Sequence, residues 1–290
     1  MLDVNISKEI ESCAARISDA MLSTVVCEDS DLSVLYDSMR YSAGDGGKRI
    51  RPFITCAVSE MLSGDSSVAL SFALAVEMIH TYSLIHDDLP CMDNDDFRRG
   101  KATNHKVFGE AEALLAGDAL LTGAFDTIAC ADCDGDTKAQ AVAVLSRAAG
   151  ASGMIGGQII DIKSEGKSID FDLLIKMHTL KTGALIRAAA RLGTIAAGCT
   201  SPDIVEKIDL YAKNVGLAFQ IEDDVLDAEE ALENPDAKAE PKTTFMSFMS
   251  AEEAMAFAMR LTEEAKAAIG DIPNSSTLIA LADHLLVRKV

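Results

Sequence analysis

Hydrophobic positions along the chain recur with the period of an α-helix almost from end to end. One stripe near the N-terminus repeats at intervals of three and four residues: Ile6, Ile10, Cys13, Ile17 and Met21. This spacing places those side chains on one face of an amphipathic helix. Alternation of apolar and polar residues, which is typical of half-buried strands, is nearly absent. The pattern predicts an all-α bundle of about ten helices, several of them apolar on most sides.

Alanine-rich segments with high helix propensity support this prediction, and glycine, proline and asparagine separate them. The segments are 69–88, 109–129, 183–198 and 251–269, and the predicted loops are 44–47, 100–104, 132–136, 198–202 and 234–241. No low-complexity linker or solenoid-length repeat divides the chain. We therefore predict a single domain over residues 1–290.

Composition limits the classes of function. The formal net charge is −20, which disfavours nucleic-acid binding because that binding relies on a broad basic surface. The seven cysteines are scattered and odd in number, as expected for reduced thiols rather than a disulfide framework. The N-terminus has acidic residues where a secretory signal has basic ones, and charges interrupt the apolar runs. We expect a cytoplasmic protein without a membrane span.

An acidic cluster lies at the end of a long apolar segment, in the stretch HDDLPCMDNDD at 86–96. Pro90 is unsuited to a helix interior, so the helix is expected to kink or stop there and let Asp93 fold back toward Asp87 and Asp88. His80 and Ser83 lie seven and four residues before Asp87, on the same helical face. A solvated acidic loop is the alternative interpretation, since the whole chain is acidic.

A second cluster, FQIEDDVLD at 219–227, has a different construction. Gln220, Asp223, Asp224 and Asp227 fall at i, i+3, i+4 and i+7, so one helical face presents an amide and three carboxylates. A solvated helix face is again the alternative. The flanking residues are apolar, however, so this face is expected to point into protein or a cleft, where carboxylates need partners.

Hard oxygen ligands at this density suit Mg²⁺, with Mn²⁺ as a substitute. Zinc is disfavoured because neither cluster has a His/Cys ligand set. Six carboxylates and a diphosphate together carry about nine negative charges, so about three divalent ions plus basic side chains would approach neutrality.

Basic residues stand out against the acidic composition. Lys48 and Arg51, in GGKRIRP at 46–52, open a helix after a Gly-Gly turn, a natural position for phosphate. Arg98 and Arg99 follow the first acidic cluster, and Lys181 with Thr182 interrupts an apolar helix. These groups suggest a cavity with two kinds of diphosphate site, one held by metal and one by Arg and Lys.

The chain resembles the trans-polyprenyl diphosphate synthases of the farnesyl/geranylgeranyl type. Five segments carry the resemblance in the family's order, over roughly residues 35–245: GGKRIRP, HTYSLIHDDLPCMDNDDFRRGKATNH, GMIGGQIIDI, HTLKTGALIR and FQIEDDVLD. The resemblance implies an isoprenoid-synthase-type helical bundle, a homodimer with a deep central cavity between two aspartate-rich motifs. It also implies a short-chain prenyltransferase that condenses isopentenyl diphosphate with dimethylallyl or geranyl diphosphate.

The resemblance implies a role for each marked residue. Mg²⁺ would be held by Asp87, Asp88, Asp93, Asp223, Asp224 and Asp227. Arg98 and Lys181 would assist at the allylic diphosphate. Isopentenyl diphosphate would bind Lys48, Arg51, His80 and Arg99, and the oxygens of Thr182 and Gln220 would stabilise the allylic cation. The released pyrophosphate would accept the proton.

Product length is implied by Tyr82, five residues before Asp87, and by the adjacent Ser83. In the family an aromatic residue there blocks the growing chain, so the resemblance points to farnesyl diphosphate. Geranylgeranyl diphosphate synthase is the alternative, and Tyr82 as ordinary core packing is the other interpretation of that residue. A class I terpene cyclase and a non-catalytic subunit of a heteromeric synthase are the remaining rivals. The basic segment and the full second motif disfavour the cyclase, and the complete aspartates disfavour the subunit.

The segment after the second motif departs from the family. DAEEALENPDAKAEPKTTF, at 227–245, lacks the family's glycines and leaves only Lys238 and Lys242 as candidate ligands of the allylic diphosphate. Arg288 and Lys289 near the C-terminus are weaker candidates for the second diphosphate, and a solvated tail is the preferred interpretation.

Overall fold

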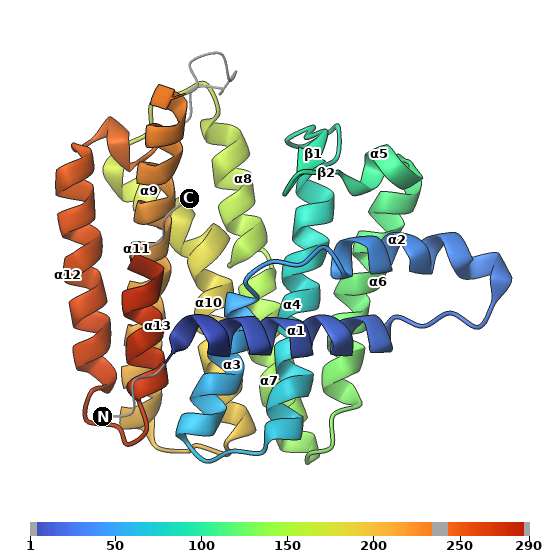
Figure 1. Ribbon diagram of the computed structural model, residues 1–290, viewed down its shortest axis with the longest axis horizontal. Coiled ribbons are helices and arrows are strands. Elements are labelled where there is room, and N and C mark those ends of the chain that lie inside the picture. The colour runs from blue at the N-terminus through green and yellow to red at the C-terminus, as the bar shows by residue number, and fades with distance from the viewer. Residues whose placement is uncertain (1–4, 234–242, 287–290) are drawn as a thin grey trace.

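The computed structural model describes residues 5–233 and 243–286 (Figure 1). Within them are thirteen α-helices: α1 (Ile6–Thr24), α2 (Ser33–Ala43), α3 (Ile50–Met61), α4 (Ser66–Asp87), α5 (Asn104–Phe108), α6 (Glu110–Ala129), α7 (Gly135–Ala149), α8 (Met154–Ser164), α9 (Phe171–His178), α10 (Ala184–Ala196), α11 (Pro202–Glu233), α12 (Ala251–Ile269) and α13 (Ser276–Leu286). The short elements are η1 (Ser30–Leu32), η2 (Thr179–Gly183), η3 (Phe245–Ser247), β1 (Phe97–Arg98) and β2 (Lys101–Ala102).

The predicted all-α class is confirmed, whereas the predicted count of about ten helices is too low. The five-residue helix α5 is too short to show a hydrophobic period, and the segment HTLKTGALIR contains a boundary between α9, a π-helical turn η2 and α10. The loop predicted at 100–104 includes the second strand of a small antiparallel hairpin. The prediction of one domain over 1–290 stays a prediction.

The first helix forms as its apolar stripe predicts. Asn5 caps α1 by accepting a hydrogen bond from the Lys8 amide at 3.3 Å. Four of the five stripe residues, Ile10, Cys13, Ile17 and Met21, are buried. This face packs against α3 and α4, which fixes the N-terminal helix across the bundle (Figure 1).

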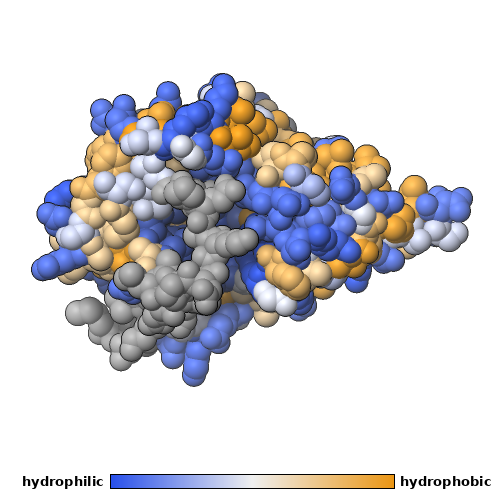
Figure 2. Space-filling view, turned by 90° about the horizontal axis from the view of Figure 1, so that it is seen from above, coloured by the Kyte–Doolittle hydropathy of each residue, from blue (hydrophilic) through white to orange (hydrophobic). Residues whose placement is uncertain are grey.

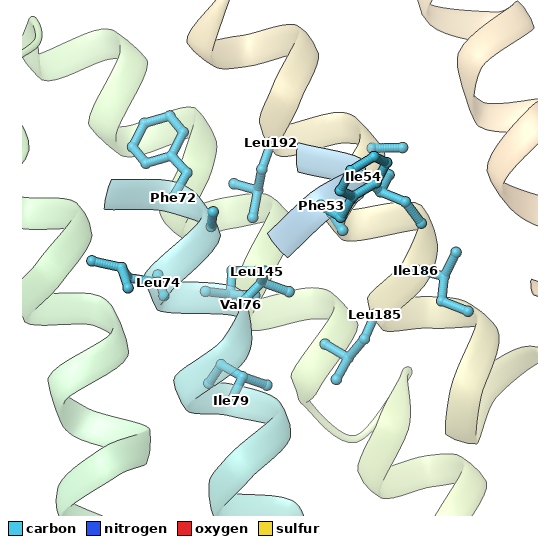
Figure 3. Packing of buried hydrophobic residues seen from close by; sticks show 14 of the residues in the cluster. Phe53, Ile54, Phe72, Leu74, Val76, Ile79, Leu145, Leu185, Ile186 and Leu192 are labelled. Carbon is cyan, nitrogen blue, oxygen red and sulfur yellow. The ribbon is translucent and has the colours of Figure 1, made fainter. Parts of the chain in front are cut away.

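Helix α4 is the centre of the main core. Its buried residues occupy most of its circumference, and it contacts α3, α6 and α10. Figure 3 shows Phe72, Val76 and Ile79 following one another along α4, with Leu192 of α10 near Phe72 and Leu145 of α7 near Val76. Each fully buried aliphatic or aromatic side chain contributes about 1.5–3 kcal/mol relative to exposure, so α4 is held mainly by burial.

Helices α3 and α10 approach closely at Gly193. A Cβ atom on Gly193 would lie 2.6 Å from the Thr55 carbonyl oxygen, so only glycine permits the observed packing. The Thr55 hydroxyl donates to the Ala189 carbonyl at 3.0 Å across the same contact. The two helices therefore form a rigid wall on one side of α4.

Helix α4 is also long and apolar enough to cross a membrane by length and composition. In the described residues it is the single such helix, and 72% of its apolar window is buried inside the molecule. Its apolar character is thus explained by its central position in the core.

The two helices that carry the aspartate motifs end on the same side of the bundle. α4 and the long helix α11 run upward in Figure 1, and their C-terminal ends lie at the upper edge with β1 and β2. Figure 2 looks onto this end, where many of the coloured residues are hydrophilic. A second, smaller apolar cluster joins α9, α11 and α12 beneath it and includes Leu174, Ile221 and Phe245.

Candidate active site

The first aspartate motif is shaped by the end of α4. The helix stops at Asp87, three residues before Pro90, as the sequence predicts. The chain then turns sharply, and the Asp93 amide donates to the Asp87 carbonyl at 2.9 Å. Asn94 completes the turn with a left-handed backbone, φ 54°. The predicted return of Asp93 toward the helix end is confirmed.

The carboxylates of this motif differ in their surroundings. Burial raises the pKa of Asp87 to about 6 against the opposing effect of the Lys181 ammonium, and nearby Asp93 contributes to the rise. Asp93 itself is exposed. A partly buried carboxylate with a negative neighbour requires a cation to stay charged, which fits the chemistry of a divalent-ion site.

The Asp88 carboxylate forms an ion pair with a neighbouring arginine. Its Oδ1 accepts hydrogen bonds from Arg98 Nε at 2.8 Å and Nη2 at 2.6 Å, and its side chain is 5% exposed. Burial raises the pKa of Asp88 while the Arg98 guanidinium opposes the rise. Asp88 therefore fixes the position of Arg98, which the hairpin β1–β2 supplies from the other side of the turn.

The second motif lies on the uninterrupted helix α11. Gln220 and Asp223 are half-buried, Asp224 is buried and Asp227 is exposed. Asp224 Oδ2 accepts a hydrogen bond from the Phe245 amide at 2.9 Å, and burial raises the pKa of Asp224 to about 6. The predicted inward orientation of this face is thus confirmed for Asp224, whereas Asp227 reaches solvent.

A π-helical turn presents the polar pair opposite α4. Thr182 Oγ1 donates to Gln220 Oε1 at 2.9 Å, which joins η2 to α11. Lys181 Nζ forms an ion pair with Asp161 of α8. A Cβ atom on Gly157 would lie 2.2 Å from the Lys181 backbone nitrogen, so that glycine allows α8 to approach η2 closely.

Basic residues line the other side of the cavity. Arg49 forms a buried ion pair with Glu77 at 2.6 Å and donates from Nη2 to the Ala43 carbonyl at 2.6 Å. Arg99 Nη1 donates to the Gly46 carbonyl at 3.0 Å, joining the hairpin to the GGKRIRP segment. Burial lowers the pKa of His80, and Arg51 and Arg99 lower it further, so this imidazole is neutral.

These groups surround two connected cavities. The first, which we call the basic chamber, has a volume of ≈ 470 Å³ and is lined by residues that include Lys48, Arg51, Arg98, Arg99, Gln220 and Asp223. The second, the apolar chamber, has a volume of ≈ 460 Å³ and is lined by residues that include Tyr82, Ser83, Asp87, Met154, Ile155 and Lys181. Arg51, His80, Leu84 and Thr182 line both chambers, so the two are continuous.

The structure gathers most of the residues marked in the sequence. Fourteen of them line the chambers, lie beside them or belong to the two motifs: Lys48, Arg51, His80, Tyr82, Ser83, Asp87, Asp88, Asp93, Arg98, Arg99, Lys181, Thr182, Gln220 and Asp223. Asp224 and Asp227 continue the second motif on α11. Among residues 5–233 and 243–286, no three acidic, histidine or cysteine side chains form a ready-made metal group. The candidate Lys238 lies outside the described residues, as do Lys242, Arg288 and Lys289.

Four further residues of the site were not marked in the sequence. Asp161 pairs with Lys181, Glu77 pairs with Arg49, and Gln158 lines the apolar chamber. Both polar side-chain atoms of Gln158 are buried without a hydrogen-bond partner in the described part of the chain. A polar or charged residue within an otherwise apolar helix was the available signal for Glu77, Gln158 and Asp161. Arg49 carried no such signal, because its position depends on a left-handed backbone, φ 48°.

Comparison with known proteins agrees with this geometry. A family model described as polyprenyl synthetase matches residues 32–272. The chain is 47% identical over 265 residues to geranylgeranyl diphosphate synthase of Cyanophora paradoxa, covering 88% of each chain. It is 38% identical over 294 residues to farnesyl diphosphate synthase of Escherichia coli, covering 97% of this chain and 98% of that one.

Solved structures show the same similarity. An FPP/GFPP synthase from Zymomonas mobilis, determined without ligand, superposes with a TM-score of 0.90 at 36% identity, covering 98% of this chain and 99% of that chain. The helical bundle, the two aspartate motifs and these relatives lead to one conclusion. The chain belongs to the polyprenyl synthetase family and is a short-chain prenyltransferase.

Proposed function

We propose that the protein condenses isopentenyl diphosphate with dimethylallyl or geranyl diphosphate and releases (E,E)-farnesyl diphosphate. The observation that carries this proposal is the pair of connected chambers, one basic and one apolar, with an aspartate motif at each side. An anionic head group fits the basic chamber, and a prenyl chain fits the apolar chamber.

The acidic residues are the proposed ligands of about three divalent ions, Mg²⁺ or Mn²⁺. Asp87, Asp93, Asp223 and Asp227 are the residues proposed to face them directly. Bound Mg²⁺ would supply charge neutralisation of the departing diphosphate. Asp88 and Asp224 were also predicted as ligands, and their contacts with Arg98 and Phe245 support a role in fixing the two motifs.

The basic residues are proposed to divide the two substrates between them. Arg98 and Lys181 lie near Asp87 and assist at the allylic diphosphate. Lys48, Arg51 and Arg99, with neutral His80, hold isopentenyl diphosphate in the basic chamber. Each guanidinium offers a planar pair of donors to a diphosphate oxygen.

Thr182 and Gln220 are proposed to stabilise the allylic cation. The Thr182 hydroxyl donates its proton to Gln220 Oε1, so the lone pairs of the Thr182 oxygen remain directed away from that bond. Neutral oxygens stabilise positive charge without forming a lasting bond to the carbon. The pyrophosphate group accepts the proton that the condensation releases, so no side-chain base is assigned.

Tyr82 and Ser83 are proposed to set product length. Both line the apolar chamber, and the Tyr82 ring packs edge-on against His86 with centroids 5.6 Å apart. The Tyr82→Ala substitution removes the ring and is expected to shift products from C15 toward C20. Chromatography of the products is the measurement, with Tyr82→Phe as the control that keeps the ring. Unchanged chain length in Tyr82→Ala would contradict this role.

A geranylgeranyl product is the second candidate, because relatives with that printed name are among the most similar. An assay with Mg²⁺, labelled isopentenyl diphosphate and each allylic starter tests both candidates. Accumulation of a C20 product from every starter would overturn the farnesyl proposal. Hydrocarbon released from farnesyl diphosphate alone would instead indicate a terpene cyclase.

We further propose a homodimer that acts in the cytoplasm. Exposed apolar residues on α5 and α6, namely Val107, Leu114 and Leu115, support a partner surface there. Light scattering of the purified protein tests the assembly, and a monomer at all concentrations would contradict it.

A further inference from the structure

A third cavity lies on the side of the turn η2 opposite to the active site. This hollow, which we call the rear pocket, has a volume of ≈ 330 Å³. Residues from α7, α10 and η2 line it together with one from α11, and its polar lining includes Arg147, Thr179, Arg187, Arg191 and Asp209. None of these residues lines the basic or the apolar chamber.

The rear pocket gathers positive charge in a strongly acidic protein. Three guanidinium groups and one carboxylate line it, so its charged lining has a net charge of +2 (three minus one), whereas the chain has −20. Arg187 is matched by Asp209, through Nε at 2.8 Å and Nη2 at 2.7 Å. This ion pair therefore neutralises the charge of one of the three arginines in the lining.

Among the residues that the structure describes, the other two arginines, Arg147 and Arg191, have no acidic partner. Arg191 makes one long hydrogen bond, from Nη1 to Thr194 Oγ1 at 3.3 Å. The exposed Arg147 side chain makes no hydrogen bond or ion pair with the residues that the structure describes. Because Asp209 offsets the charge of Arg187, Arg147 and Arg191 supply the positive charge that the lining leaves unbalanced. A bound anion would balance this charge, and guanidinium groups suit phosphate oxygens.

The rear pocket shares a wall with the active site. Thr179 and Leu180 of η2 line the rear pocket, while the next two residues, Lys181 and Thr182, line the apolar chamber. Gly153 at the start of α8 contributes to the rear pocket, and the following Met154 to the apolar chamber. A ligand in the rear pocket therefore contacts the turn that positions Lys181 and Thr182.

We propose that the rear pocket is a second anion site, which binds inorganic pyrophosphate and stabilises the π-helical turn from behind. Pyrophosphate has the required chemistry, because its charge and two phosphoryl groups match two guanidinium groups that have no acidic partner in the described part of the chain. It is also the by-product of the prenyl transfer, so its concentration rises as the enzyme works. The site is separate from the one in which the reaction occurs.

Calorimetric titration of the full chain with inorganic pyrophosphate tests the proposal. EDTA removes divalent ions, and four forms are compared: wild type, Arg147→Gln/Arg191→Gln, Arg51→Gln/Arg99→Gln in the basic chamber, and the charge-matched control Lys138→Gln/Arg260→Gln. We expect at least ~10-fold weaker binding at the rear site in the first double variant. The basic-chamber variant and the charge-matched control are expected to keep that binding.

Hydrogen–deuterium exchange locates the ligand. Pyrophosphate is expected to protect peptides from 143–153 and 179–191 in wild type and in Arg51→Gln/Arg99→Gln, but not in Arg147→Gln/Arg191→Gln. Circular dichroism checks folding, and the single Arg147→Gln variant, at an exposed position, repeats the test if the double variant unfolds. Inorganic phosphate and a prenyl diphosphate in parallel titrations show whether one phosphoryl group suffices and whether a tail adds affinity.

Several results would overturn the proposal. Equal pyrophosphate affinity in wild type and Arg147→Gln/Arg191→Gln would do so, as would protection confined to the basic chamber. An equal loss of affinity in Lys138→Gln/Arg260→Gln would show that net charge alone is responsible. Tighter binding of a prenyl diphosphate than of pyrophosphate at this site would reassign the ligand.

Discussion

The two aspartate motifs reach the same cavity by different constructions. The first motif depends on a helix end and a turn that returns Asp93 to Asp87. The second uses the periodicity of one continuous helix, α11. In both, the second aspartate of the adjacent pair is buried and held by protein: Asp88 by the Arg98 side chain and Asp224 by the Phe245 backbone amide.

This difference affects what each anchor can tolerate. Asp88 is held by a charge-assisted pair, which requires the negative charge of a carboxylate. Asp224 accepts from a neutral amide, a bond that a side-chain amide oxygen can also accept. The stability of the first motif should therefore depend on the negative charge of Asp88, and that of the second motif on the presence of a hydrogen-bond acceptor at position 224. Substitution of each aspartate by asparagine distinguishes these two requirements.

The largest effect is expected from the aspartate of each motif that lines a chamber, Asp87 in the first and Asp223 in the second. Asp87→Ala and Asp223→Ala should each lower kcat on the order of 10³-fold, since both are proposed to stabilise the departing diphosphate through a bound ion. Steady-state assays with geranyl and isopentenyl diphosphate measure this loss. Asp96→Ala, which removes an exposed carboxylate paired with Lys106, is the control and should leave activity nearly unchanged. A large loss of kcat in one variant and none in the other would contradict the proposal that both motifs hold ions on the departing diphosphate.

Ligand protection tests whether the motifs act together. Mg²⁺ with inorganic pyrophosphate at about 100 times the dissociation constant should raise the free energy of unfolding by about 2.7 kcal/mol. Thermal or urea unfolding measures the shift. The double variant Asp87→Ala/Asp223→Ala should lose the part of this protection that EDTA abolishes, because pyrophosphate in the rear pocket needs no divalent ion. EDTA-sensitive protection retained in the double variant would place the ions elsewhere.

The anchors should differ when each carboxylate becomes an amide. Asp88→Asn removes the close charged partner of Arg98, which keeps the longer ion pair with Asp95 at 3.7 Å, and should destabilise the fold by about 1–3 kcal/mol. Asp224→Asn can still accept from the Phe245 amide, so we expect about 1 kcal/mol or less. Urea unfolding of both variants at pH 7 makes the comparison, and equal destabilisation would contradict the distinction between these two requirements.

The smallest effect concerns His80, on the basic side of the first motif. Its pKa is lowered in the folded state, so below the ordinary value near 6.5 the unfolded chain binds a proton that the folded chain does not. Stability is therefore lost as pH falls below that value, by at most about 1.4 kcal/mol per pH unit. His80→Gln should lose less stability than wild type between pH 7 and 5.5. Parallel urea titrations measure this, and identical slopes would show that His80 is protonated in the fold.

Local patterns predicted much of the fold and site. The stripe from Ile6 to Met21 and the stop of α4 before Pro90 follow from periodicity and from proline chemistry. The acidic face of α11 follows from the i, i+3, i+4 and i+7 spacing. These features depend on residues close together in the chain.

Features that depend on distant partners could not be predicted in this way. Arg98 contacts Asp88 because the hairpin of β1 and β2 brings the chain back beside the end of α4. The Phe245 amide contacts Asp224 although the two residues are 21 positions apart in the sequence. The ion pair of Asp161 with Lys181 needs Gly157 to bring α8 onto η2. The hydrophobic periodicity of a sequence predicts which face of a helix is buried, but it does not predict which other helix packs against that face.

The π-helical turn at Thr179–Gly183 changes the phase of the chain between α9 and α10. A π turn contains more residues than an α turn, so no single helical wheel describes the surface on both sides of it. Removing one residue from this turn would leave the composition almost intact yet rotate every later side chain of α10 by about 100° about its axis. Length here is consequently as constrained as residue identity, and insertions or deletions should be tolerated far less than substitutions.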